Sequence, residues 1–369
     1  MTETFLVVGS LNRHTPYFES ASGVGLSVFA FDADAATTLM CEERSVDNPT
    51  FLAVEPETAC IYAVSEVFGW HEGTASAYRY DRGARRLRYI NKQPCLGSTS
   101  THCSLDGKAQ RLLVANYGFG PAEEGPDRAF AVFPIREDRG LSPAVGSALH
   151  KGRGPRDDRQ ERPHPHCALA SPDGRFVIVA DLGLDALFTY GFDALGGILS
   201  APVAVCAFPA GSGPRHVAFH PNGCLAVAIR ELDSTLTTLR YDAPSGRLSP
   251  LYSVSALPDG YLDVSHSSDI QIGCDGRVVY VANRGHDSVA AFALDAESGA
   301  LTLLGHEPCG GRTPRAMAID PSGRYLAVAN QNSDVVTIFE LDPTTGRLVG
   351  CVSEIRIGSP MCVRFLALS

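Results

Sequence analysis

The segment that decides the fold is SPDGRFVIVAD at residues 171–181, in which a Pro-Asp-Gly turn precedes an apolar run that ends on a polar residue. Such a turn followed by β-branched and aromatic residues predicts a hairpin leading into a buried strand. The same phrase recurs along the chain. The clearest copies are DGRVVYVANR at 275–284, PSGRYLAVANQ at 321–331, HPNGCLAVAIR at 220–230 and DGKAQRLLVANY at 106–117.

The spacing of the copies shows that one repeat fills the chain. The residues that end the apolar runs lie roughly 50 positions apart, as in repeats that form propeller blades. They are Gly9, Ser65, Asn116, Asp181, Ile229, Asn283 and Asn330. Each unit contains four short strand patterns with no helical period, which is the signature of a propeller blade. We therefore predict an all-β chain that folds as a single domain over residues 1–369, a seven-bladed β-propeller.

The two ends of the chain predict how the ring closes. Residues 360–365 resemble a first strand with nothing after it, and the opening segment supplies the other three strands of a blade. A blade built from both termini would remove the exposed edges of an open array.

Composition restricts the partners and the location. The net charge of −10 and the pI near 5.5 argue against nucleic acid and anionic membranes as partners. No apolar run is long enough for a membrane helix, and residues 1–8 lack the basic region of a signal peptide. The eleven cysteines contain no C-x-x-C pair, so we expect free thiols and a cytoplasmic location.

The repeat predicts where polar side chains converge. First strands line the channel, so the residue after the Pro or Ser that opens each one should face one mouth. These residues are Thr50, Thr99, His166, Arg215, Ser268, Arg315 and Met361. The second strand is antiparallel to the first and ends at the same mouth, which adds Glu66, Asn116, Asp181, Glu231, Arg284 and Gln331.

The residue types at this mouth indicate a site for a small anion. Arginines from different blades suit carboxylate or phosphate oxygens, and a carboxylate beside them stays ionised while a histidine moves protons. The structural alternative is that Arg215 and Arg315 only pair with carboxylates of other blades. The candidate catalytic residues are His166, Arg215, Glu231 and Arg284, and the candidate substrate-binding residues are His164, Arg315, Glu66, Asn116, Asp181 and Gln331.

Other polar groups are interpreted more conservatively. His164 and His166 should share a strand face, but no third ligand follows, and we expect neither a metal nor another cofactor. The loop 150–163 either covers the site and holds a phosphate or is a solvated insertion; its candidate cations are Lys151, Arg153 and Arg156. The recurring Asp185, Asp233, Asp287 and Asp334 precede third strands and are interpreted as turn residues.

Several phrases resemble the seven-bladed propeller lactonases, a family of bacterial 6-phosphogluconolactonases and fungal 3-carboxy-cis,cis-muconate cyclases. They are Asn48-Pro49-Thr50, His164-Pro165-His166-Cys167, Gly213-Pro214-Arg215-His216, Asn283-Arg284-Gly285-His286-Asp287, Thr313-Pro314-Arg315 and Ala329-Asn330-Gln331. The resemblance implies an active site without a metal at His166, Arg215, Glu231 and Arg284. One departure is Arg230, where the family usually has Asn; an added cation there would hold Glu231 ionised.

These observations predict a metal-independent lactonase for a small anionic lactone, most simply that of a phosphorylated sugar. Glu231 would deprotonate water, His166 would protonate the leaving alkoxide, and the arginines would bind negative charge. Three alternatives stay open: a lactone-forming cycloisomerase, a Ca²⁺-dependent lactonase using Glu66, Asn116 and Asp181, and a non-catalytic binding propeller.

Overall fold

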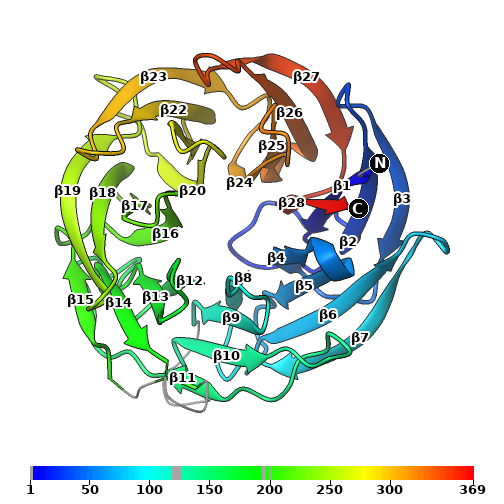
Figure 1. Ribbon diagram of the computed structural model, residues 1–369, viewed down its shortest axis with the longest axis horizontal. Helices are drawn as coiled ribbons and strands as arrows, with labels where there is room; N and C mark the ends of the chain where they lie inside the picture. The colour runs from blue at the N-terminus through cyan, green and yellow to red at the C-terminus, as the bar shows by residue number, and fades with distance from the viewer. Residues whose placement is uncertain (1–2, 119–126, 193–196, 199–200) are drawn as a thin grey trace.

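Seven four-stranded antiparallel sheets surround a central channel (Figure 1), as the repeat predicts. The computed structural model describes residues 3–118, 127–192, 197–198 and 201–369. Each inner strand contacts the inner strands of the blades on either side of it. The all-β class, the seven blades and their four-stranded make-up are therefore confirmed.

The blades are numbered here by their inner strands in chain order. Blade 1 contains β4 (Pro49–Glu55), β5 (Cys60–Ser65), β6 (Thr74–Asp81) and β7 (Arg86–Pro94). Blade 2 contains β8 (Ser100–Leu105), β9 (Arg111–Asn116), β10 (Phe130–Pro134) and β11 (Gly146–Ala148). Blade 3 contains β12 (Pro165–Ala170), β13 (Phe176–Asp181), β14 (Ala186–Gly191) and β15 (Ala204–Ala207). Blade 4 contains β16 (Pro214–Phe219), β17 (Leu225–Arg230), β18 (Thr235–Asp242) and β19 (Arg247–Ser255).

The remaining blades follow the same order from the channel outward. Blade 5 contains β20 (His266–Ile272), β21 (Val278–Arg284), β22 (Ser288–Leu294) and β23 (Leu301–Pro308). Blade 6 contains β24 (Pro314–Ile319), β25 (Tyr325–Asn330), β26 (Val335–Leu341) and β27 (Leu348–Arg356). Blade 7 contains β28 (Pro360–Leu368), β1 (Glu3–Ser10), β2 (Leu26–Phe31) and β3 (Thr37–Glu43). Two short 3₁₀ turns, η1 (Pro56–Thr58) and η2 (Gln331–Ser333), lie in blades 1 and 6.

Blade 7 joins the two ends of the chain. β28 pairs with β1 from Glu3↔Leu368 to Ser10↔Pro360, so the last strand is the inner strand of a blade whose outer strands come first. Figure 1 shows the two termini beside each other in this blade. The expected ring closure is confirmed.

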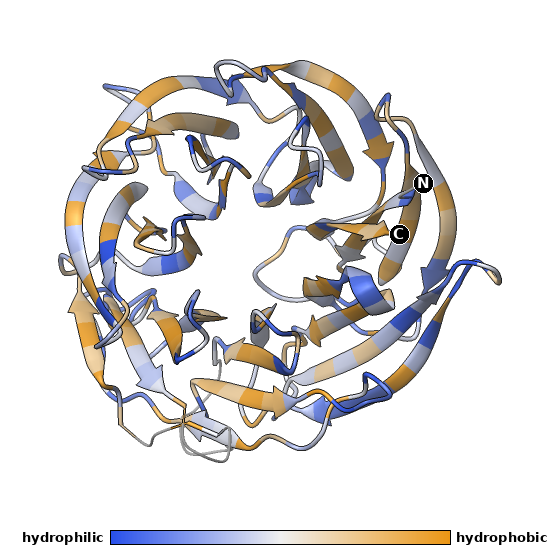
Figure 2. Cartoon of the chain, viewed as in Figure 1, coloured by the Kyte–Doolittle hydropathy of each residue, from blue (hydrophilic) through white to orange (hydrophobic). Residues whose placement is uncertain are grey.

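The core lies within and between the blades. Second strands such as β13 and β17 are buried along their whole length, whereas the outer strands β7 and β19 are exposed or half-buried except at one residue each. Figure 2 shows the apolar residues concentrated on the strands. All eleven cysteines are free, and seven of them are buried like small apolar residues.

Each inner strand begins with a bulge that aims one side chain into the channel. The register skips a residue between Pro165 and Cys167, between Pro214 and His216 and between Pro314 and Ala316. The other blades show the same irregularity near their first residues. Bulges re-aim side chains and are common beside active sites. The bulged residues include His166, Arg215 and Arg315, which explains why these side chains reach the mouth.

Three positions in the predicted repeat were wrong by one or two residues. The residue opposite the first proline of β16 is Arg230, so the run in blade 4 ends there and not at Ile229; likewise Ser10 replaces Gly9. In blade 2 the bulge holds Thr101, because Ser100 pairs with Asn116, so Thr99 is not the ring residue. The apolar pattern alone does not reveal a bulge, and each bulge shifts the register by one residue.

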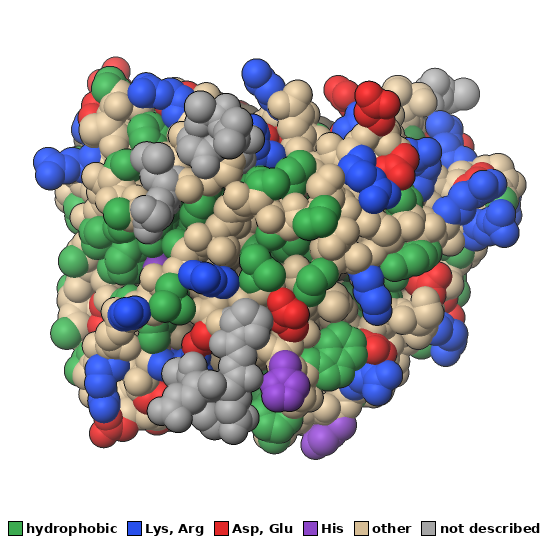
Figure 3. Space-filling model, turned by 90° about the horizontal axis from the view of Figure 1, so that it is seen from below, with side chains coloured by type: hydrophobic (Ala, Val, Ile, Leu, Met, Phe, Trp, Pro, Cys, Tyr) green, Lys and Arg blue, Asp and Glu red, His purple; other side chains and the backbone are tan. Residues whose placement is uncertain are grey.

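Two further observations concern the outer surface of the ring and the length of its helical segments. On the side of the ring seen in Figure 3, basic and acidic side chains are interspersed. Within the described ranges, no helix is long and apolar enough to cross a membrane.

Candidate active site

A cavity of about 310 Å³ lies where the inner strands begin. Its walls come from several blades and from the loops at this mouth. The lining residues are Tyr17, Phe18, Glu66, Thr101, Tyr117, Arg159, His166, Glu231, His266, Arg284 and Arg315. Three of the four predicted catalytic residues and two of the predicted binding residues, Glu66 and Arg315, are therefore together in one cavity.

Glu231 is the electrostatic centre of this cavity. Its Oε2 lies 2.9 Å from Nε of Arg215 and 2.9 Å from a terminal nitrogen of Arg284, and its Oε1 contacts Arg159. Only 2% of Glu231 is exposed. Burial by itself would raise the pKa of this carboxyl, but Arg284, Arg159 and Arg215 hold it well below its ordinary value. Glu231 is thus a fixed anion that gathers three guanidinium groups.

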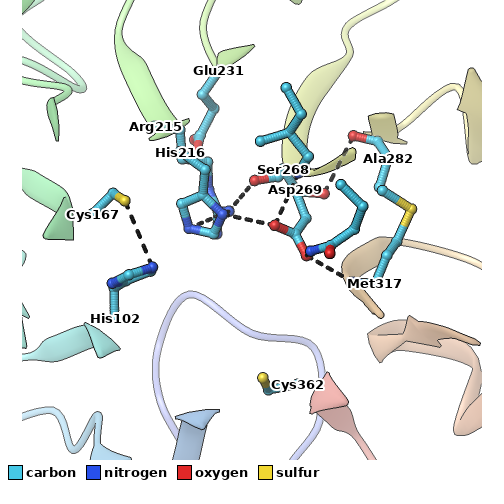
Figure 4. Close-up of polar contacts among 12 residues, drawn as sticks. His102, Cys167, Arg215, His216, Glu231, Ser268, Asp269, Ala282, Met317 and Cys362 are labelled. Carbon is cyan, nitrogen blue, oxygen red and sulfur yellow. Dashed lines mark hydrogen bonds and ion pairs between the residues drawn. The ribbon is translucent and has the colours of Figure 1, made fainter. Parts of the chain in front are cut away.

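Arg215 lies beneath the cavity and not on its wall. Burial and repulsion by Arg284 lower its pKa to about 9, which leaves it charged at neutral pH. Besides Glu231, it contacts the carbonyl oxygen of Ser268 and the ring of His216 (Figure 4). Arg215 therefore orients Glu231 from below, a role close to the structural alternative considered for it.

His166 faces the cavity as a neutral base. It is 5% exposed, and its Nδ1 has no hydrogen-bond partner among the described residues. Burial and then the charge of Arg215 lower its pKa well below the ordinary value, so the ring is uncharged at neutral pH. Its ring packs edge-on against Tyr117 at 5.6 Å between centroids.

Glu66 and Arg315 form the second charged pair of the cavity. A terminal nitrogen of Arg315 lies 3.6 Å from Oε2 of Glu66, and the guanidinium stacks over Phe18 at 4.8 Å. Burial raises the pKa of Glu66 despite the charge of Arg315. Four arginines thus face two carboxyl groups in and under this cavity, so its fixed charge is positive and suits an anionic ligand.

Four predicted binding residues do not line the cavity. Asn116 and Asp181 end their second strands one residue too early; in blade 2 the next residue, Tyr117, lines the cavity. A shift of one residue turns a strand side chain to the opposite face. His164 stacks on Tyr117 at 4.3 Å, and the amide nitrogen of Gln331 donates to Oδ1 of Asn332.

The side chains that miss the cavity hold the connections between blades instead. Nδ2 of Asn116 donates to the carbonyl oxygen of Cys95 at 2.8 Å, and Oδ1 of Asp181 accepts from the backbone N–H of His164 at 2.8 Å. The oxygens of Glu66, Asn116 and Asp181 therefore do not converge on one ion. Among the described residues, no group of three His, Cys, Asp or Glu side chains has the arrangement of a metal site.

The loop 150–163 contributes a cation that the sequence analysis did not select. Arg159 enters the cavity, and its attraction to Glu231 raises its pKa above the ordinary value. Lys151, Arg153 and Arg156, the expected phosphate ligands, do not line the cavity; Arg153 pairs with Asp157, and Arg156 pairs with Asp158. All three lie outside the cavity, in a part of the loop that is exposed or half-buried, which favours the solvated insertion over a phosphate clamp for these three residues.

Two further expectations are resolved by contacts. Arg230 turns away from Glu231, pairing with Asp233 at 3.2 Å and stacking over Phe208, so it does not hold Glu231 ionised. Asp185, Asp287 and Asp334 adopt the left-handed conformation and accept backbone N–H groups, as expected of turn residues. In blade 4 that position belongs to Ser234 and not to Asp233.

Tyr117, Thr101, His266, Tyr17 and Phe18 also line the cavity but were missed. Tyr117 follows the repeated Ala-Asn dipeptide directly, so a correct register would have found it. Thr101 was hidden by the bulge in blade 2. Tyr17 and Phe18 lie in the loop between β1 and β2, outside any repeat, and the sequence gives no signal for them.

Comparison with known proteins agrees with this architecture. Residues 5–365 match the family described as "Lactonase, 7-bladed beta-propeller". The chain is 35% identical to the 6-phosphogluconolactonase of Bacillus subtilis over 342 residues, which cover 92% of this chain and 94% of that protein. It is 31% identical to the 6-phosphogluconolactonase of Formosa agariphila over 322 residues, or 86% of each chain. The crystal structure of the periplasmic gluconolactonase of Pseudomonas aeruginosa superimposes with a TM-score of 0.88 at 31% identity, covering 100% of both chains. This chain therefore belongs to the lactonase family of seven-bladed β-propellers.

Proposed function

We propose that this protein hydrolyses the lactone of an anionic sugar, of the 6-phosphogluconolactone type, in the cavity that His166, Glu231 and Arg284 line. The observation that carries the proposal is a neutral buried histidine beside a carboxylate that collects three arginines. The relatives named above include two 6-phosphogluconolactonases and one gluconolactonase, which favours hydrolysis over the cyclising alternative.

The electrostatics favour a division of roles that differs from the sequence-based hypothesis. A carboxylate with a strongly lowered pKa is a weak base, so Glu231 is poorly suited to deprotonate water. His166 is neutral at working pH and its Nδ1 has no hydrogen-bond partner among the described residues, so we assign it as the base. Glu231 then serves to fix Arg159, Arg215 and Arg284, which face it from three directions.

The proposed reaction uses one histidine twice. His166 takes a proton from the attacking water while the water oxygen bonds to the lactone carbonyl carbon. Arg284 and Arg159 stabilise the negative charge that develops on the carbonyl oxygen. When the ring C–O bond breaks, the imidazolium of His166 returns its proton to the leaving alkoxide, and the product is an open-chain acid. The surplus of cations also favours a substrate with a phosphate or carboxylate group.

The binding of the rest of the substrate is assigned to the Glu66 side of the cavity. Oγ1 of Thr101 is buried and has no hydrogen-bond partner among the described residues, and Oε2 of Glu66 accepts no hydrogen bond there, although it pairs with Arg315 at 3.6 Å. Buried polar atoms without partners are uncommon in folded proteins, and a ligand rich in hydroxyl groups would satisfy both. We therefore assign Glu66, Thr101 and Arg315 to the hydroxyl groups of the sugar.

The test is hydrolysis of freshly prepared 6-phosphoglucono-δ-lactone and glucono-δ-lactone, corrected for the spontaneous reaction. We expect turnover of both, a higher kcat/KM for the phosphorylated lactone, and no effect of a chelator. His166→Phe keeps an aromatic ring but no basic nitrogen, and it should lower kcat about 100-fold or more.

His220→Phe is the matched control for His166→Phe. His220 is a buried histidine in the turn after β16, at the opposite end of that strand from Arg215. The His220→Phe variant should retain the wild-type rate. Folded wild-type protein that hydrolyses neither lactone would overturn the proposal, and loss of activity in chelator would instead support the Ca²⁺-dependent alternative.

A further inference from the structure

A buried histidine and aspartate lie directly behind the candidate active site. His216 follows Arg215 on β16, and Asp269 lies on the neighbouring inner strand β20. Nδ1 of His216 and Oδ1 of Asp269 are 2.9 Å apart, and both side chains are almost completely buried. They also line a second cavity of about 320 Å³ farther along the channel. The reaction described above assigns neither residue a role.

The surroundings of Asp269 fix it as an acceptor. Its Oδ2 accepts the backbone N–H of Met317 at 2.8 Å, and its Oδ1 accepts that of Ile270 at 2.9 Å (Figure 4). Burial opposes its ionisation, but the hydrogen bond from His216, the charge of Arg364 and the backbone N–H of Met317 keep the pKa of Asp269 below its ordinary value. An ionised carboxylate beside Nδ1 requires that this nitrogen carry the proton, which fixes the ring in its Nδ1–H tautomer.

The fixed ring in turn supports Arg215. One terminal nitrogen of Arg215 lies 3.1 Å from Nε2 and 3.5 Å from Nδ1 of His216. With the proton on Nδ1, Nε2 keeps its lone pair, so the shorter contact is a hydrogen bond that the Arg215 guanidinium donates to Nε2. Burial and the charge of Arg215 lower the pKa of His216 to about 4, so the ring is uncharged at neutral pH.

We propose that His216 and Asp269 are positioning residues, which hold the Arg215 guanidinium against Glu231 and thereby set the geometry of the active site. The guanidinium is held by Nε2 of His216, the carbonyl oxygen of Ser268 and Oε2 of Glu231, so its orientation depends on each contact. Neither His216 nor Asp269 lines the cavity that holds the reacting groups. The pair acts only through Arg215. This inference rests on the roles proposed for Arg215 and Glu231.

The experiment is a double-mutant cycle measured on kcat. Asp269→Asn should lower kcat about tenfold or more with little change in KM, because small displacements of catalytic groups are costly while binding groups stay in place. In an Arg215→Lys background the same change should have almost no further effect, since contacts that act through one residue are not additive. Asp320→Asn is the matched control, because Asp320 is also a buried carboxylate that accepts backbone N–H groups.

A purely structural role would give a different result. It would lower the melting temperature, and the loss of kcat would be the same in both backgrounds or shared by Asp320→Asn. Either result overturns the inference, as would wild-type kcat in folded Asp269→Asn.

A second measurement is independent of folding in the variants. Nitrogen-15 NMR of wild-type protein with labelled histidine should show His216 neutral with the proton on Nδ1 at pH 7, and an Nε2–H or charged ring would contradict the inference. If Glu231→Gln proves fully active, the proposed function fails; if that variant is inactive while Asp269→Asn matches wild type, only the positioning role fails.

Discussion

Two rings of polar residues, offset by one position, differ sharply in what they do. The residues that end the second strands include Asn116, Asn283 and Asn330, and each of these amides donates to a carbonyl oxygen in the connection from the preceding blade. The residues one position later include Glu66, Glu231 and Arg284, which line the cavity. The first ring repeats an asparagine in blades 2, 5 and 6 because these blades make the same connection, and the second ring is not repeated because a single site needs different groups. In a propeller, repeated polar residues therefore indicate scaffold, and the departures from the repeat indicate chemistry.

The adjacent pair Asn283 and Arg284 provides the largest expected contrast between the rings. Arg284→Ala should lower kcat/KM about 100- to 1000-fold, because it removes a cation aimed at the developing negative charge. The melting temperature should change little. Steady-state kinetics with calorimetry on the same preparations will measure both quantities.

Asn283→Ala should have the opposite profile. It removes one of the two donors to the carbonyl oxygen of Ala256 and the acceptor of the Ser267 hydroxyl, so the free energy of unfolding should fall by about 1–3 kcal/mol. The kcat of the folded fraction should stay within about twofold of wild type. If Asn283→Ala lowers kcat as much as Arg284→Ala, the division between the two rings is wrong.

The buried histidines of the channel predict that the stability of the fold depends on pH. The asparagine side chains at the ends of the second strands do not titrate and add no such dependence. Burial lowers the pKa values of His102, His166 and His216 below the ordinary value near 6.5. The unfolded chain therefore takes up protons below pH 6.5 that the folded chain does not bind, and stability falls as the pH falls. The expected loss is about 1 kcal/mol per histidine for each pH unit below 6.5.

Urea unfolding at pH 7 and pH 5.5 will test this dependence. Carboxyl groups with ordinary or lowered pKa values contribute little in that window, and Glu66, whose pKa burial raises, acts in the opposite direction. His102→Phe should reduce the difference in unfolding free energy between the two pH values by about one third, because it removes one of the three histidines. Equal stability of wild type at the two pH values would contradict the neutral state inferred for these rings.

A smaller contrast is expected within the loop 150–163. Arg159→Ala should lower kcat/KM about tenfold, because the side chain enters the cavity and contacts Glu231. Arg153→Ala removes a solvated partner of Asp157 and should change kcat/KM by less than about twofold. Kinetics of the two variants on one lactone are the measurement. A larger effect of Arg153→Ala would restore the phosphate clamp first expected in this part of the loop.

The sequence predicts the fold far better than the site, for a physical reason. Seven copies of one turn-and-strand phrase determine the number of blades, and the unmatched strands at the two ends determine the closure. The identity of the cavity depends on which side chain each strand turns inward, and one bulged residue reverses that choice. His166, Glu231 and Arg284 were found because the repeat places them at this mouth, whereas Asn116 and Asp181 were chosen on a register one residue too early.

Other features of the site depend on contacts between distant segments. Arg159 belongs to a loop with several similar cations, and only the fold shows which of them reaches Glu231. Tyr17 and Phe18 come from a connection in blade 7, whereas Arg159 lies in the connection between blades 2 and 3. The shifted pKa values of His166 and Glu231, which decide the division of roles, result from burial and neighbours that the sequence does not show.

The most direct test of the account uses the adjacent residues Arg230 and Glu231. Both are buried, but Arg230 turns to Asp233 while Glu231 gathers three arginines in the cavity. We predict that Glu231→Gln lowers kcat/KM for 6-phosphoglucono-δ-lactone by about 100-fold or more, whereas Arg230→Gln changes it by less than about threefold. Equal losses in the two folded variants, or full activity of Glu231→Gln, would contradict the assignment of this cavity as the lactonase site.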